Sequence, residues 1–224
     1  MKTSREPAGG WGEFLLVVVG AFGCPVLGSL YYAFNPQVMT GYTTGSFWGL
    51  VVFEISFLIV LGSVLRYRGW SLRSLGLTFH WTDIPAGIVL ALVAWLSYRV
   101  LFSGLSLVVP NLSVIAANLH VVTPGVSFGS VLSVVIVNPV YEEIFVAGYI
   151  IASLKDGRHT GLAINTSVAV RLLYHLYQGM IGVVLIVPFG LLFATWFART
   201  RRLWPLIVAH ALFDAAGMFP FVRW

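Results

Sequence analysis

The sequence places ionisable side chains inside stretches that are otherwise apolar, and their types suit hydrolytic chemistry. These residues are Glu142, Glu143, Arg171, His175, His210 and Asp214. A charged group at the centre of a bilayer costs about 2.5–3.5 kcal/mol on insertion scales, so such groups mark functional sites by default. A carboxylate beside an imidazole can take a proton from water, and a second imidazole can donate to the oxyanion that forms at a carbonyl group. The residue types therefore indicate hydrolysis by an activated water within a membrane.

Helical spacing and depth group these side chains. His210 and Asp214 are four residues apart, as are Arg171 and His175, so each pair projects from one helix face. At a rise of about 1.5 Å per residue, Glu142 and Asp214 lie roughly 18 Å from the inner ends of their apolar runs, His175 roughly 21 Å and His210 roughly 12 Å. We therefore expect them to share one layer of the membrane. Asp214 can orient the imidazole of His210 or, when protonated, donate a hydrogen bond as well.

The adjacent glutamates are expected to have different roles. Successive residues of a regular α-helix point about 100° apart, so Glu142 and Glu143 cannot easily share one proton or one metal ion. We expect one of them to face the chemistry and the other to face a structural partner. A helix distortion near Pro139 would loosen this restriction.

Composition indicates an integral membrane protein. Hydrophobic residues make up 58% of the 224 residues and charged residues only 9%, against about 45–50% and 25% in soluble domains. A helical span needs about 20 mostly apolar residues, and such runs occupy 12–34, 47–65, 83–104, 127–154, 162–178, 180–198 and 203–221. We predict one domain, residues 1–224, that folds as an all-α, polytopic transmembrane helical bundle. It has about seven spans, with eight as the alternative count. Asn138-Pro139 interrupts the fourth run, so a span preceded by an interfacial helix is the other interpretation of that run.

Basic residues occur in every second segment that connects these runs. They are Lys2, Arg5, Arg66, Arg68, Arg73, Lys155, Arg158, Arg199, Arg201 and Arg202. The intervening loops 35–46 and 105–126 contain no Lys or Arg. The positive-inside rule then puts the N-terminus in the cytoplasm and the C-terminus outside. The net charge of +5 is explained by this bias, so we expect no nucleic-acid partner.

Two further charged residues, Glu54 and Arg99, lie within the second and third runs. Both lie roughly 8–10 Å from the outer ends of those runs. We expect them to form an ion pair or to act as interfacial anchors, apart from the site.

Three short motifs resemble those of the CAAX protease and bacteriocin-processing family of intramembrane proteases. The run Glu142–Gly148 resembles the family's Glu-Glu-x-x-x-Arg, Arg171–His175 resembles its Phe-x-x-x-His, and His210–Asp214 resembles its His-x-x-x-Asn/Asp. The order and spacing of the motifs also agree, and the similarity covers a protease-like core at about residues 66–219.

The resemblance implies an intramembrane endopeptidase that needs no cofactor. Glu142 and His175 would activate water, Glu143 would support the site, and His210 with Asp214 would form the oxyanion side. The implied partners are the lipid bilayer and a membrane-associated or lipidated peptide or protein substrate, and the oligomeric state is open. The implied location is a bacterial cytoplasmic membrane, which the chain crosses several times.

Two positions depart from the family motifs. Ala147 stands where the family has arginine, and Arg171 stands at the phenylalanine position. Because buried carboxylates need charge compensation, we expect Arg171 to supply from the fifth run the guanidinium that the fourth run lacks.

Other functions stay open at this point. The change at Ala147 suits a non-catalytic pseudoprotease or an immunity or adaptor protein, and the same charged layer could serve a proton-coupled transporter. Zinc could be bound by Glu142, His175 and His210. The run Gly125–Gly129 matches the Gly-x-Ser-x-Gly pattern of serine hydrolases, but it precedes a membrane span and has no sheet to hold it.

Overall fold

The computed structural model describes residues 10–38, 41–113, 122–154 and 159–223. The long helices are α1 (Trp11–Phe34), α2 (Thr44–Tyr67), α3 (Asp83–Ser106), α5 (Phe128–Glu142), α7 (Thr160–Tyr174), α8 (Gly179–Thr200) and α9 (Trp204–Met218). α5 continues through a π-helical segment, η2 (Glu143–Tyr149), into α6 (Ile150–Leu154). The short elements are the 3₁₀ turns η1 (Pro36–Val38), η3 (Leu176–Gln178) and η4 (Phe219–Phe221) and the strands β1 (Val126–Ser127) and β2 (Val222–Arg223).

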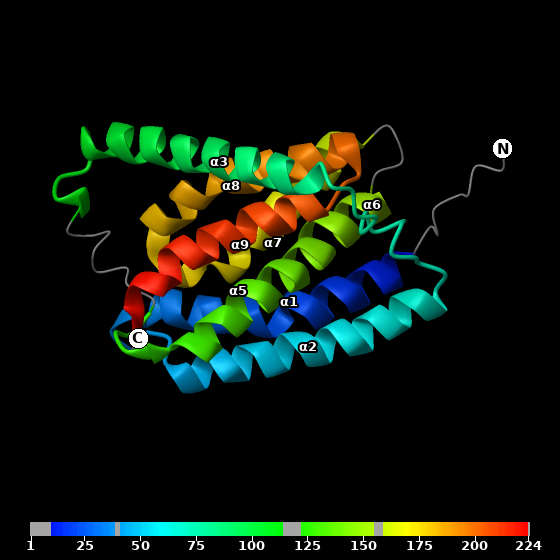
Figure 1. Cartoon of the computed structure of the whole chain (residues 1–224), viewed down its shortest axis with the longest axis horizontal. Coiled ribbons are helices and arrows are strands. Elements are labelled where there is room, and N and C mark those ends of the chain that lie inside the picture. The colour runs from blue at the N-terminus through cyan, green and yellow to red at the C-terminus, as the bar shows by residue number, and fades with distance from the viewer. Residues whose placement is uncertain (1–9, 39–40, 114–121, 155–158, 224) are drawn as a thin grey trace.

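The helices lie side by side in one bundle. α3 packs on α9, α9 on α5, and α5 on α2, so α2 and α3 lie on opposite outer sides (Figure 1). α7 packs against α1 and α8. The predicted all-α polytopic bundle is therefore confirmed.

Seven helical segments correspond to the seven predicted spans. Six are long and apolar enough to cross a membrane, namely Trp11–Phe34, Thr44–Tyr67, Asp83–Ser106, Phe128–Leu154, Leu176–Thr200 and Trp204–Phe221. α7 has 15 residues, which is shorter than the roughly 20 needed to cross the hydrocarbon core. The run 128–154 is one continuous helical segment, so Asn138-Pro139 does not separate an interfacial helix from a shorter span, and the described residues show no eighth span.

The fourth of these long segments is the central helix of the bundle. It is 72% buried over its apolar window, whereas the other five are 17–33% buried. The outer helices instead expose apolar side chains such as Ile59 and Leu92, as helices facing lipid do. Charged groups on the central helix are consequently shielded from lipid by its neighbours.

The basic segments meet at one end of the bundle. Arg68 donates to Glu13 at 2.6 Å and Arg202 donates to Asp83 at 2.7 Å, which joins the loop after α2 to α1 and the loop after α8 to α3. The predicted alternation of charge is therefore matched by the arrangement of the helices, while the direction of the bundle in the bilayer stays a prediction. Lys2, Arg5, Lys155 and Arg158 lie outside the described residues.

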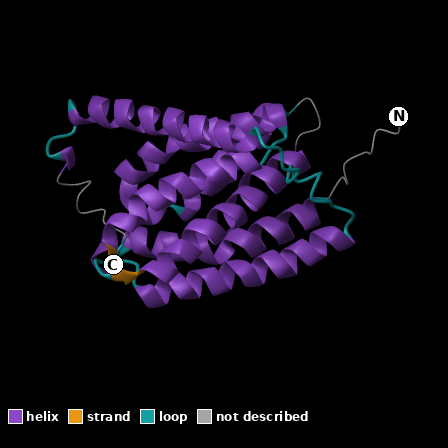
Figure 2. Cartoon of the chain, in the orientation of Figure 1, coloured by secondary structure: helices purple, strands orange, loops and turns teal. Residues whose placement is uncertain are grey.

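The opposite end is closed by a small parallel strand pair. Val126 of β1 is in register with Val222 of β2, and Tyr42 forms a bridge with Val122. These pairings hold the start of α5, the loop before α2 and the chain end after α9 together (Figure 2). Gly125 and Ser127 lie in this closure, and Ser127 accepts from the Ser130 backbone N–H as the N-cap of α5.

Candidate active site

The central helix changes geometry at the glutamate pair. α5 ends at Glu142, and the π-helical segment η2 begins at Glu143. π-Helical turns are rare and occur frequently at functional sites. Both carboxylates approach Arg171 and His210. The two carboxylates therefore share Arg171 and His210 as partners, where the regular helix gives way to the π-helical segment about one turn after Pro139.

Arg171 on α7 binds both glutamates. Its Nη2 donates to both carboxylate oxygens of Glu143 at 2.8 Å, and its Nη1 lies 3.4 Å from Glu142 Oε2. The side chain is only 2% exposed, and the rings of Phe189 and Phe193 lie 5.2 and 5.8 Å from its guanidinium carbon. Charge-assisted bonds of this kind are about twice as strong as neutral ones. The structure thus places a cation from α7 against the carboxylates of the central helix.

His210 on α9 lies among three carboxylates. Its Nδ1 is 2.7 Å from Glu143 Oε1, and its Nε2 is 3.9 Å from Glu142 Oε2 and 3.7 Å from Asp214 Oδ1. A nearby carboxylate favours the charged form of imidazole. Because Nδ1 makes the short contact with Glu143, this glutamate orients the ring more directly than Asp214 does.

The Glu142 carboxylate is held by neutral donors as well as by Arg171. The Tyr174 hydroxyl donates to Glu142 Oε2 at 2.6 Å. The side-chain amide of Asn138, one turn earlier on α5, donates to Glu142 Oε1 at 3.2 Å. Glu142 therefore keeps a fixed orientation with each oxygen in a different environment.

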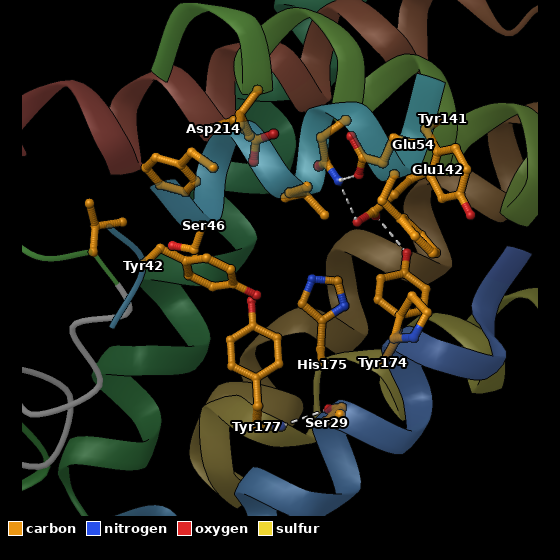
Figure 3. Close-up of a pocket in the computed structure, with 18 of the residues that line it drawn as sticks. Ser29, Tyr42, Ser46, Glu54, Tyr141, Glu142, Tyr174, His175, Tyr177 and Asp214 are labelled. Atoms are coloured by element: carbon orange, nitrogen blue, oxygen red, sulfur yellow. Dashed lines mark hydrogen bonds between the residues drawn. The ribbon is translucent and has the colours of Figure 1, made fainter. Parts of the chain in front are cut away.

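His175 follows the last residue of α7. Its Nδ1 lies 2.9 Å from the backbone carbonyl oxygen of Arg171. A carbonyl oxygen only accepts, so Nδ1 carries a proton and Nε2 of the neutral ring is left as an acceptor. The ring projects into the space between Tyr177 and Glu142 (Figure 3).

A cavity of about 740 Å³ connects these groups. Among the expected site residues, its wall includes Glu142, His175, His210 and Asp214. Glu143 and Arg171 are not part of that wall. The glutamate pair is therefore divided as expected in one respect, because Glu142 faces the cavity and Glu143 faces partners behind it.

Comparison with known proteins finds a family model that matches part of the chain. Residues 124–216 match the family model described as Type II CAAX prenyl endopeptidase Rce1-like. This segment is similar to the type II CAAX prenyl endopeptidases. The resemblance of the three motifs is thereby confirmed, since all of them lie within the matched residues. No curated protein and no solved structure matched the chain.

The two departures from the CAAX protease motifs are related in space. Ala147 lies within η2 and is fully buried, and it offers no charge to the glutamates of that helix. Arg171, at the family's phenylalanine position, binds them from the neighbouring helix α7. The guanidinium is therefore present at the site although its position in the sequence differs.

Three members of the site were not expected from the sequence. Tyr174 and Asn138 are uncharged, and only their positions next to His175 and one turn before Glu142 could have indicated them. Glu54 accepts a hydrogen bond from Asn138 at 2.6 Å and lines the cavity.

The expected pairing of Glu54 with Arg99 is wrong. α2, which carries Glu54, and α3, which carries Arg99, lie on opposite sides of the bundle (Figure 1). Arg99 instead has its guanidinium carbon 6.0 Å from the ring of Trp95 on its own helix.

Replacing Tyr174 by phenylalanine is expected to lower the turnover number of a peptidase by about tenfold, by analogy with the loss of the outer hydrogen-bond partner of a metal ligand. The substitution removes the donor to Glu142 Oε2 but keeps the ring, which stacks on Phe22 at 5.0 Å. The temperature of thermal unfolding in detergent should change little. An unchanged turnover number would show that this hydrogen bond does not contribute to catalysis.

Proposed function

We propose that this protein is an intramembrane endopeptidase in which Glu142 and His175 activate a water molecule. The observation that supports this most strongly is the cavity of about 740 Å³ inside an apolar bundle, with Glu142, His175, His210 and Asp214 in its wall. A hydrolase within a membrane needs such a polar space, because both water and the peptide bond must reach the catalytic groups.

The reaction can be written from the groups in the wall. Water between Glu142 and His175 gives a proton to the Glu142 carboxylate while its oxygen bonds to the carbonyl carbon of the scissile peptide. The carbonyl oxygen becomes an oxyanion, and the doubly protonated ring of His210 donates to it through Nε2. The proton held by Glu142 then passes to the amide nitrogen as the carbon–nitrogen bond breaks, which leaves one carboxylic acid and one amine.

Glu143 and Arg171 support this chemistry from behind the wall. Glu143 accepts from His210 Nδ1 and directs its Nε2 toward the cavity. Arg171 compensates the charge of the carboxylates, so that Glu142 and Glu143 can both stay ionised in a buried site.

We propose a membrane-associated or lipidated peptide as the substrate. The matched family model is described as a type II CAAX prenyl endopeptidase, and a CAAX motif is a C-terminal sequence whose cysteine carries the prenyl group. The cavity wall includes the aromatic side chains of Phe22, Tyr32, Phe47 and Phe53, against which an isoprenoid or an apolar peptide side chain can pack.

Peptide cleavage by the purified protein in lipid nanodiscs tests the proposal. The probe is an internally quenched peptide that ends in a farnesylated CAAX sequence, with an unprenylated transmembrane peptide as the second probe. We expect His175→Ala to reduce cleavage at least about a hundredfold, as removal of a general base or acid does. The matched control is His80→Ala, because His80 lies in the loop before α3 and outside the cavity. Binding of the probes without cleavage by the wild-type protein would instead support a pseudoprotease.

A metal-dependent reaction is the alternative for which the geometry names candidate ligands. Among the described residues, Glu142, Glu143 and His210 have potential ligand atoms within 4.8 Å of one another. His175, which the sequence offers as an alternative zinc ligand, is not in this group. The group suits a metal poorly, because Glu143 already accepts from Arg171 through both oxygens and a cation there would face the guanidinium.

We therefore expect cleavage to survive metal removal. After dialysis against EDTA and 1,10-phenanthroline, the rate should stay within about twofold of the untreated rate, since carboxylate–histidine chemistry needs no ion. Elemental analysis of the same sample checks that zinc has been removed. A loss of activity that added zinc restores would favour the metal mechanism.

A further inference from the structure

Glu54 lies outside the matched residues 124–216 but belongs to the catalytic cavity. It is carried by α2, is 1% exposed and lines the cavity wall. In the described part of the chain its Oε2 has no hydrogen-bond partner. A carboxylate buried in a membrane bundle without a cation is costly and marks a functional position by default.

The contact that Glu54 makes leads directly to Glu142. Asn138 Nδ2 donates to Glu54 Oε1 at 2.6 Å and to Glu142 Oε1 at 3.2 Å. A side-chain amide nitrogen carries two hydrogens, so it can serve both acceptors. Glu54 and Glu142 lie close together at the cavity wall in Figure 3. Glu54 thereby fixes the direction in which Asn138 presents its second hydrogen.

The oxygen that Asn138 contacts is the one suited to accept a proton from water. Glu142 Oε2 is occupied by the Tyr174 hydroxyl at 2.6 Å and by Arg171 at 3.4 Å. Within the described residues, Oε1 accepts only the longer bond from Asn138. Because a carboxylate oxygen has two lone pairs, Oε1 keeps capacity for the proton that water gives up.

We infer that Glu54 is a positioning residue for this hydrolysis, acting through Asn138 on the Glu142 oxygen that accepts the proton. This inference rests on the proposed function. It assigns to α2 a part in catalysis that lies beyond the three motifs and beyond the matched segment. Glu54 itself touches neither water nor substrate in this role, and its effect depends on its oxygen as an acceptor rather than on its charge.

Two substitutions separate the acceptor from the charge. Glu54→Gln keeps a side-chain oxygen for Asn138 and removes the charge, whereas Glu54→Leu removes the acceptor at similar volume. We expect Glu54→Leu to lower kcat on the farnesylated probe by about tenfold or more, by analogy with the loss of the outer hydrogen-bond partner of a metal ligand, with KM unchanged. Glu54→Gln should keep most of the wild-type kcat. The matched control is Val52→Ala on the same helix, since Val52 is 63% exposed and faces away from the site.

Combining Glu54→Leu with Glu142→Gln provides a second test. Residues that act through one group are strongly non-additive, so Glu54→Leu should lower the residual rate of the Glu142→Gln protein less than about twofold. An equal loss in both backgrounds would mean that Glu54 supports the fold, and the inference would be wrong. Equal losses in Glu54→Leu and Glu54→Gln, or a raised KM at normal kcat, would also overturn it.

A structure of the Glu54→Leu protein provides a reading that does not depend on activity. The Asn138 amide is expected to turn away from Glu142 Oε1 in this variant, and a retained bond at the wild-type position overturns the inference. If the wild-type protein cleaves no probe, the proposed function fails, and this structural reading still decides whether Glu54 positions Asn138.

Discussion

Glu142→Gln is expected to lower the rate of peptide cleavage by about a thousandfold, within the range of 10² to 10⁴ that general-base catalysis contributes. Glutamine keeps the shape of the side chain and can still accept from Tyr174 or Asn138 through its single oxygen. It cannot take a proton from water. Single-turnover cleavage of the farnesylated probe measures the effect on the chemical step without interference from product release.

The matched control for this variant is Glu143→Gln. Both substitutions remove one carboxylate from the central helix, but only Glu142 lines the cavity. Arg171 keeps its bidentate partner Glu143 when Glu142 is changed, so Glu142→Gln should unfold at nearly the wild-type temperature. Glu143→Gln is expected to lose stability, because Arg171 and His210 both lose a charged partner. A Glu142→Gln protein that cleaves at more than a tenth of the wild-type rate would contradict the assigned role of Glu142.

Membrane spans and the residues of the polar layer could be predicted because each leaves a local mark in the sequence. The bilayer requires about 20 apolar residues per span, and an ionisable residue inside such a run is conspicuous. His175, His210 and Asp214 were expected at the depth of Glu142, and the structure places all four in the wall of one cavity. The compensating role of Arg171 was expected from charge balance together with the family resemblance, which marks Ala147 as the position where a cation is missing.

The rotation of the helices about their axes could not be predicted. A helix that is apolar on all sides has no amphipathic pattern to show which face lies inward. Glu54 was therefore expected near Arg99 on the third run, although the structure turns it toward Asn138. The short contact between His210 Nδ1 and Glu143 was also not expected. It depends on how α9 packs against α5.

The π-helical segment also could not be predicted, because an analysis that assumes the regular α-helical period does not reveal it. The expected division of Glu142 and Glu143 assumed about 100° per residue, and this holds through α5 but not from Glu143 onward. The assumption still led to a correct distinction, since one carboxylate faces the cavity and the other faces Arg171 and His210. That both carboxylates contact Arg171 and His210 could be learned only from the structure.

Removal of the Arg171 side chain should lower the free energy of unfolding by about 3–5 kcal/mol, as breaking one side of a buried ion pair does. In Arg171→Ala the carboxylates of Glu142 and Glu143 stay buried without the guanidinium that binds both. Titration with SDS in mixed micelles, followed by tryptophan fluorescence, measures the loss. Arg171→Lys is the matched control, because it keeps the charge and loses only the planar, forked geometry, so its effect should be smaller.

A paired exchange tests whether the site needs this arginine or only a guanidinium. The protein with both Ala147→Arg and Arg171→Phe has the residues of the family motifs, with the cation supplied by the central helix itself. Ala147→Arg alone should destabilise the protein, because position 147 is fully buried and Arg171 already occupies the carboxylates. In the double variant, the guanidinium at position 171 is lost and another is gained at position 147. The double variant should therefore be more stable than the sum of the two single losses predicts. Additive losses would mean that the two positions do not share one charge-compensating role. Full activity and stability of Arg171→Ala would remove that role altogether, and the buried glutamates would then need another source of compensation.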